Sequence, residues 1–154
     1  MIEQKLLNKA RELNEEIYSA LTTNTLNWTI LKPEDISDLL KFDMQCLEQE
    51  ELRIVILNTK NHVMEIVDLY RGSVNSSAVR IGEIFRDCVR LNGSAIIVVH
   101  NHPSGDPTPS PDDIELTKEI IRAGDLLDIQ VLDHIVIALA GIRSITKILG
   151  ESLQ

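Results

Sequence analysis

Residues 95–113 constrain this chain more than any other segment, because an apolar run there ends on two histidines and a proline-rich loop. The run AIIVVH predicts a buried strand, on which residues i and i+2 point to the same face. His100 and His102 are therefore expected to direct both imidazoles to one side of a sheet. Residues 103–111 contain four prolines, which stiffen the return of the chain to a helix start at Ser110. Strand-to-helix exits of this kind are frequent ligand sites in α/β sheets.

Asp113 completes a candidate metal site with the two histidines. A carboxylate at the helix start can turn back toward His100 and His102, and two imidazoles with one carboxylate around an open position suit catalytic zinc. Ser110 and Asp113 also have the spacing of a capping box, with Pro111 at the first helical position. A structural role alone would explain those two residues. The histidine pair favours the metal site, and the cap would then hold the carboxylate toward the imidazoles.

A catalytic zinc also needs a general base near its water, because the metal by itself only lowers the pKa of that water. Four acidic residues near predicted strands are candidates, and spacing alone does not choose among them: Glu50, Glu51, Glu65 and Asp68. Ser104, in the proline-rich loop, is interpreted as a turn residue. His134, beside Asp133, is interpreted as a hydrogen-bonded histidine at a strand start, with a supporting role behind the metal ligands as the alternative.

Periodicity elsewhere predicts an α/β domain behind an N-terminal helical arm. Apolar residues at helical spacing from Ile2 to Leu21 predict the arm, and a break near Thr29 sets the arm at residues 1–30 and the domain at 31–154. Further helices are expected from Pro33 to about Phe42, from Ser76 or Ser77 to Leu91, and from Ile114 to Ala123, where Gly124 would end the last one. Strands are expected at 52–57, 62–70, 95–100, 129–132 and 134–140, with Asp133 between the last two, and 142–149 stays undecided.

Charge and composition limit the partners. The net charge of −9 argues against an electrostatic grip on nucleic acid, and the sequence contains no run of Lys and Arg that would form a basic patch. It also contains no 18-residue apolar stretch, so no membrane span is expected. The charged N-terminus is unlike a signal peptide, and Cys46 and Cys88 form no CxxC pair. We therefore expect a cytoplasmic protein whose N-terminal helix packs on its own core or on another copy in a homo-oligomer.

The histidine–proline segment resembles a known signature. His100-Asn101-His102-Pro103 followed by Ser110-x-x-Asp113 resembles the JAMM motif of MPN/JAB-domain metalloproteases, and HNHPSGDPTPSPDD is most similar to the RadC branch. The likeness extends to Glu50–Arg53, LNTKN, GSVNS and LLDIQVLDHIVI, and covers the chain from about Ile36 onward. The resemblance implies the cytidine-deaminase-like α/β fold of JAB/MPN domains, a mixed sheet flanked by helices.

The resemblance also implies roles for residues that match the motif by position. His100, His102 and Asp113 match the three Zn²⁺ ligands, with water in the fourth place. Ser110 matches the serine that hydrogen-bonds the developing oxyanion. The resemblance also implies a general base, a glutamate that precedes an apolar strand, and Glu50 fits that position best. Glu51 is one residue off, and strand alternation would turn its side chain away from the site.

The function implied is a zinc-dependent hydrolase whose activated water attacks an amide or isopeptide bond in a peptide substrate. Two other functions stay open: a metal-bearing binding module in DNA maintenance or repair, and a metal-dependent nuclease. RadC proteins usually carry an N-terminal helix-hairpin-helix region, which the arm at residues 1–30 does not resemble. That difference and the acidic charge both speak against DNA as a partner.

Overall fold

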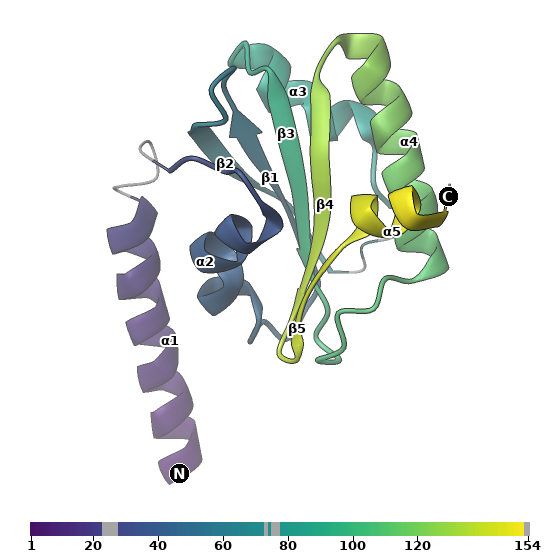
Figure 1. Cartoon of the computed structure of the whole chain (residues 1–154). Helices are drawn as coiled ribbons and strands as arrows, with labels where there is room; N and C mark the ends of the chain where they lie inside the picture. The colour runs from purple at the N-terminus through teal and green to yellow at the C-terminus, as the bar shows by residue number, and fades with distance from the viewer. Residues whose placement is uncertain (23–27, 73, 75–77, 153–154) are drawn as a thin grey trace.

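The computed structural model describes residues 1–22, 28–72, 74 and 78–152, which form a mixed sheet with helices on both faces (Figure 1). In chain order the elements are α1 (Ile2–Thr22), α2 (Pro33–Met44), β1 (Glu51–Leu57), β2 (Val63–Arg71), α3 (Ile81–Arg90), β3 (Ala95–Asn101), α4 (Pro111–Leu127), β4 (Gln130–Ala138), β5 (Gly141–Ser144) and α5 (Ile145–Ser152). The α/β architecture and the mixed sheet expected from the sequence are both confirmed.

The strand that carries the histidine pair, β3, is the central strand of the sheet, whose order is β2-β1-β3-β4-β5. β1 is antiparallel to both β2 and β3, whereas β4 is parallel to β3 and antiparallel to β5. A parallel pair needs a long crossover, which α4 supplies. The chain therefore leaves the middle of the sheet at the end of β3 and returns beside it as β4.

Alternating side chains of the central strands fill two separate cores. On one face, Val55 of β1 packs with Leu40 of α2. On the other face, Val98 of β3 packs with Phe85 of α3 and Leu116 of α4. Because both faces are covered, β1 and β3 are buried along their whole length, which explains their continuous apolar sequences.

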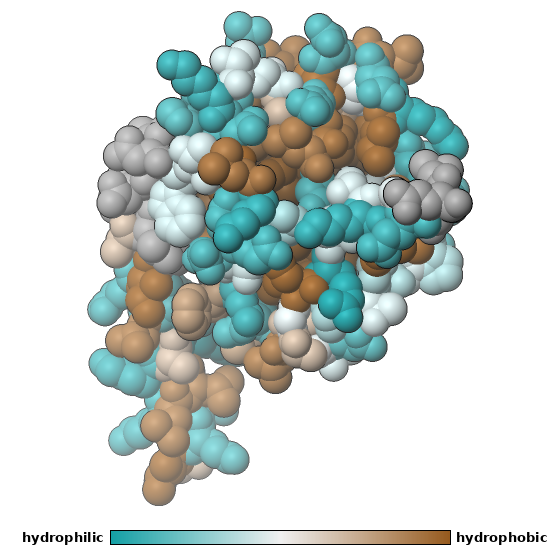
Figure 2. Space-filling model, in the orientation of Figure 1, coloured by the Kyte–Doolittle hydropathy of each residue, from teal (hydrophilic) through white to brown (hydrophobic). Residues whose placement is uncertain are grey.

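Helix α1 extends beside α2 and leaves most of its surface exposed (Figures 1 and 2). Arg11 forms a 3.0 Å ion pair with Glu48, and the side chain of Asn14 donates to the Phe42 carbonyl at 3.2 Å. Figure 2 shows apolar side chains along this helix, and Leu6 is among those that stay exposed. Within the described residues, no helix is both long and apolar enough to cross a membrane.

The end of α4 differs from the prediction. The helix runs to Leu127, so the expectation that Gly124 ends it is wrong. A Cβ at Gly124 would lie 2.6 Å from the Ile129 carbonyl oxygen and 2.8 Å from the Val131 side chain, so glycine lets α4 pack closely on β4. The helix ends instead at Asp128, whose φ of 55° is left-handed, a conformation that Asp tolerates better than most residues.

The two short strands expected around Asp133 form one strand, β4, with a β-bulge. Ile96 and Ile97 of β3 pair with Val131 and Asp133, which leaves Leu132 as the extra residue. A bulge of this kind interrupts the alternation of side chains between the two faces of a sheet. The undecided segment 142–149 divides between β5 and α5.

The start of α3 also differs, since the helix begins at Ile81. The predicted caps Ser76 and Ser77 lie outside the described residues. The cap residue of α3 is Arg80, which makes no side-chain capping bond.

Candidate metal centre

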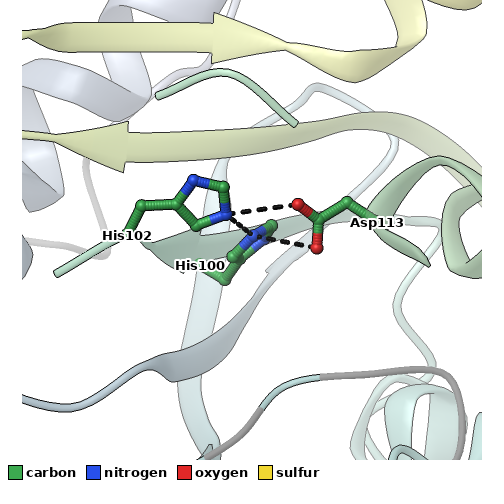
Figure 3. Close-up of side chains that lie close together, drawn as sticks. All are labelled: His100, His102 and Asp113. Atoms are coloured by element: carbon green, nitrogen blue, oxygen red, sulfur yellow. Dashed lines mark hydrogen bonds and ion pairs between the residues drawn. The ribbon is translucent and has the colours of Figure 1, made fainter. Parts of the chain in front are cut away.

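His100, His102 and Asp113 come together where β3 leaves the sheet for α4 (Figure 3). The two Nε2 atoms are 3.0 Å apart, and the Asp113 carboxylate oxygens lie 3.3 Å from that of His100 and 3.2 Å from that of His102. Four ligands at about 2.0–2.1 Å around a tetrahedral zinc are about 3.4 Å from one another. The three side chains therefore approximate one face of such a tetrahedron.

The loop after β3 orients the His102 ring. Its Nδ1 lies 2.9 Å from the backbone carbonyl oxygen of Asp106. A carbonyl only accepts, so Nδ1 carries the hydrogen and Nε2 is the bare nitrogen of the neutral ring. The backbone N–H of His102 donates to the Ile137 carbonyl at 2.8 Å, which ties the start of the loop to β4.

The capping box predicted at the start of α4 orients Asp113 and is confirmed. Ser110 Oγ accepts a hydrogen bond from the Asp113 backbone N–H at 3.1 Å, and the Asp113 carboxylate accepts one from the Ser110 N–H at 2.8 Å. The cap and the cluster share the same carboxylate. The helix start therefore determines where the carboxylate lies relative to the two imidazoles.

The electrostatics of the cluster favour a bound cation. Burial alone would raise the pKa of Asp113, but the hydrogen bonds that its carboxylate accepts when His100 or His102 is protonated outweigh it and hold that pKa well below its usual range. The hydrogen bond that protonated His102 donates to Asp113 raises the pKa of His102, against the opposing effect of burial. Imidazole nitrogens and carboxylate oxygens that face one another bind either a proton or a metal ion. This set of nitrogen and oxygen ligands fits a divalent transition metal.

His134 lies behind His100, in the supporting position that the sequence analysis names only as an alternative. His134 is fully buried, and its Nε2 is 2.7 Å from His100 Nδ1. Val131 of β4 packs in the core under α3 and α4. The bulge that follows Val131 reverses the alternation of side chains between the two faces of the sheet. His134 therefore lies on the same face as Val131 and His100. A sequence pattern with regular alternation would place His134 on the opposite face, which is why the sequence favours the other interpretation, a hydrogen-bonded histidine at a strand start.

Thr117 of α4 is a residue that sequence analysis missed. Its side chain is fully buried, with Oγ1 2.6 Å from His134 Nδ1 and 2.6 Å from the Asp113 backbone oxygen. Its position one helical turn after Asp113 is the only sequence signal, since residues i and i+4 lie on one helix face.

Glu50 lies beside the cluster. The antiparallel register of β1 and β3, continued beyond β1, sets Glu50 opposite His102 on the same face of the sheet. Its carboxylate accepts a hydrogen bond from the Val74 backbone N–H at 2.9 Å. The pKa of His102 is raised chiefly by Asp113, and the charge of Glu50 adds to that effect.

Glu51 turns to the other face of the sheet and belongs to a separate group of charges, the arginine cluster: Asp43, Glu51, Arg53, Asp68 and Arg71. The buried Arg53 guanidinium contacts Glu51 at 2.8 Å and Asp68 at 3.0 Å, and it also bonds Asp43. The second carboxylate oxygen of Glu51, Oε1, lies 2.9 Å from Arg71 Nε. Glu51 and Asp68, two of the four candidate bases, thus belong to this cluster and pair with its arginines.

The remaining candidates lie in ordinary surface positions. Glu65 is exposed on β2 and pairs with Arg90 at 3.4 Å. Ser104 is exposed, and its Oγ accepts from the Asp106 N–H at 3.4 Å, a local turn contact.

An α/β domain that holds a buried histidine–histidine–aspartate group at the exit of its central strand has the features that the JAMM resemblance implies. The family model of the RadC-like JAB domain matches residues 30–149. The chain belongs to this RadC-like JAB family.

Curated relatives carry the name UPF0758 protein. The one from Roseiflexus castenholzii is 54% identical over 117 residues, which are 76% of this chain and 50% of the relative. The one from Caldanaerobacter subterraneus subsp. tengcongensis is 43% identical over 131 residues, 85% of this chain and 55% of the relative. The chain therefore spans about half the length of the curated relatives it matches.

Proposed function

We propose that this chain is a zinc-dependent hydrolase of the JAMM type that cleaves an amide or isopeptide bond. The observation that carries the proposal is the convergence of the His100, His102 and Asp113 ligand atoms at 3.0 to 3.3 Å from one another. Membership of the RadC-like JAB family supports the same chemistry.

Five side chains have roles in the proposed reaction. His100, His102 and Asp113 would hold the zinc, which supplies Lewis-acid chemistry that makes water a nucleophile near neutral pH. Glu50 accepts the proton of the attacking water and delivers it to the leaving amine. The Ser110 hydroxyl donates to the oxyanion, and it is able to do so because its oxygen only accepts in the capping box.

Metal content is the first test of this proposal. Purified wild-type protein, offered zinc and then dialysed, is expected to hold about one zinc per chain by mass spectrometry, one ion for the single tetrahedral site. The Asp113→Ala variant is expected to hold none. A folded wild type that takes up no metal would overturn the proposal and reduce Ser110 and Asp113 to a helix cap.

Turnover is the second test, with zinc-loaded protein and a panel of peptide and isopeptide substrates. Glu50→Gln is expected to keep its zinc and lose about 10²- to 10⁴-fold in rate, the usual contribution of a general base. Glu65→Gln, which changes an exposed glutamate of β2, is the matched control and should retain the rate. Full turnover in Glu50→Gln would eliminate Glu50 as the base.

The same protein distinguishes the two alternatives named from the sequence. DNA cleavage that disappears in Asp113→Ala would show a nuclease in place of a peptidase. Tight DNA binding at physiological salt, without hydrolysis of any substrate, would show a binding module.

A further inference from the structure

A line of buried hydrogen-bonding groups runs from the candidate metal ligand His100 into the protein. His100 Nδ1 is 2.7 Å from His134 Nε2, and His134 Nδ1 is 2.6 Å from Thr117 Oγ1. His100, His134 and Thr117 are all fully buried. His134 and Thr117 both lie outside the residues to which the proposed reaction gives a role.

The direction of this line is set at its far end. Thr117 Oγ1 is 2.6 Å from the backbone carbonyl oxygen of Asp113. A carbonyl has no hydrogen to give, so the single hydrogen of the Thr117 hydroxyl must lie between these two oxygens. Toward His134, the same hydroxyl can then only accept. His134 Nδ1 therefore carries a hydrogen and donates it to Thr117.

The assignment of His134 Nδ1 as a donor also determines which other ring nitrogens of His134 and His100 carry a hydrogen. A fully buried imidazole is held neutral, because burial disfavours the charged form, so His134 Nε2 is bare. A bare Nε2 at 2.7 Å from His100 Nδ1 accepts, and Nδ1 of His100 must be the donor. In this tautomer the other nitrogen of His100, Nε2, is bare, and it faces His102 and Asp113 (Figure 3).

We propose that Thr117 and His134 are positioning residues that select the Nδ1–H tautomer of His100 and so present its bare Nε2 to the cluster. The consequence for metal binding rests on the proposed function. A metal ion needs a lone pair on the nitrogen that it binds, and the opposite tautomer would place a hydrogen there. The His100 tautomer itself is a property of the metal-free protein.

The fold supports this assignment through the bulge in β4. The extra residue Leu132 reverses the alternation, and without it His134 would point into the core under α2. Bulges often re-aim a side chain beside a functional site. Here the bulge brings His134 to a residue 34 positions earlier in the sequence.

The first measurement is the tautomer of His100 in metal-free protein. Long-range ¹H–¹⁵N NMR at about pH 8, where a free imidazole is neutral, distinguishes a protonated ring nitrogen from a bare one. Wild type is expected to show His100 protonated on Nδ1 and His134 protonated on Nδ1. A His100 ring protonated on Nε2 in the wild type would overturn the proposal outright.

Variants of Thr117 test the cause. Thr117→Val keeps the shape and removes the acceptor, so both rings are released to the opposite tautomer, in which His100 Nε2–H can donate to Asp113. Thr117→Ala removes the same hydroxyl and is measured beside it. Thr117→Ser, the matched control, keeps the hydroxyl and should keep the wild-type tautomers. Unchanged tautomers in both Thr117→Val and Thr117→Ala would overturn the role of Thr117.

The second measurement is zinc affinity, by competition with a chromophoric chelator. We expect Thr117→Val to weaken zinc binding by about 10- to 100-fold, the range seen when a partner of a metal-binding histidine is lost. Thr117→Ser should bind like the wild type. Equal affinities in Thr117→Val and wild type, with thermal unfolding unchanged, would overturn the link between tautomer and metal.

The tautomer measurement and the zinc-affinity measurement together distinguish a failure of this inference from a failure of the proposed function. A wild type with the expected tautomers that binds no zinc would contradict the proposed function and leave the tautomer assignment standing. A wild type that binds zinc with the opposite tautomer in its metal-free form would contradict only this inference.

Discussion

Two polar clusters lie at the same end of the central strands, on opposite faces of the sheet, and they differ in how their charges are balanced. The arginine cluster lies on the α2 face, where the guanidinium groups of Arg53 and Arg71 meet the carboxylates of Asp43, Glu51 and Asp68. The candidate metal centre lies on the face covered by α3 and α4, where two imidazole nitrogens face a carboxylate. One cluster brings its own cations, whereas the other brings only groups that bind one.

The difference indicates which cluster is structural and which is a ligand site. In the arginine cluster, opposite charges hold one another, and burial would be costly only if a partner were removed. In the metal centre, hydrogen bonds from outside the cluster orient the His102 ring and the Asp113 carboxylate. Both clusters contain buried charged side chains, Glu51 and Arg53 in one and Asp113 in the other, so burial alone would not separate them. The balance of donors and acceptors does.

The largest effect is expected from removing a cation of the arginine cluster. Arg53→Met leaves the buried Glu51 without its closest partner, and unfolding by urea should show a loss of about 3–5 kcal/mol. Arg71→Met, at a side chain that is 71% exposed, is the control and should lose about 1 kcal/mol or less. Zinc stoichiometry should be unchanged in both variants. A loss below 1 kcal/mol for Arg53→Met would show that the cluster does not hold the fold together.

A smaller effect is expected from adding a cation to the metal centre. Zinc at about 100 times its dissociation constant should raise the free energy of unfolding by about 2.7 kcal/mol, because it binds only the folded chain. The increment should be the same in Arg53→Met, since the two clusters lie on opposite faces of the sheet. It should vanish in Asp113→Ala. Unequal increments in wild type and Arg53→Met would show that the two clusters are coupled.

The smallest effect is expected from pH in the metal-free protein. The raised pKa of His102 gives stability that is complete below about pH 6.5 and is lost as pH rises through the folded-state pKa. The lowered pKa of Asp113 gives stability that is present above about pH 3.9 and is lost as pH falls through the folded-state pKa. Metal-free wild type should therefore be most stable at mildly acidic pH.

Urea unfolding with a chelator present, repeated across that pH range, checks this expectation. Asp113→Ala should lose the decline on the alkaline side that comes from His102, because the carboxylate that raises the pKa of His102 is gone. The arginines of the arginine cluster should contribute no such slope, since arginine stays charged throughout. Burial raises the pKa of Asp68 in that cluster, so Asp68 adds a loss of stability that begins as pH rises above its ordinary pKa and that Asp113→Ala leaves in place. An alkaline decline that persists unchanged in Asp113→Ala would assign it to another group.

Local sequence patterns predicted much of the fold, and the predictions that were wrong depended on contacts between segments distant in sequence. The continuous apolar runs of β1 and β3 predicted buried strands, and Ser110 with Asp113 predicted the start of α4, because both signals depend on neighbours in sequence. The local pattern predicts that Gly124 ends a helix, whereas the structure shows that glycine is needed there because the Ile129 carbonyl oxygen lies too close for a Cβ atom. A local pattern does not report such a contact.

The sequence by itself determined the three candidate ligands of the site, His100, His102 and Asp113. Two histidines two residues apart on a strand must share a face, and a capping box must orient its carboxylate, because strand and helix geometry are repeated in every protein. Only the tertiary structure decided which residues contact the far side of the His100 ring, away from the other two candidate ligands. The parallel pairing of β3 with β4, and the bulge at Leu132, place His134 and Thr117 there. Strand register and bulges depend on packing between distant segments, so these contacts exist only once the sheet has formed.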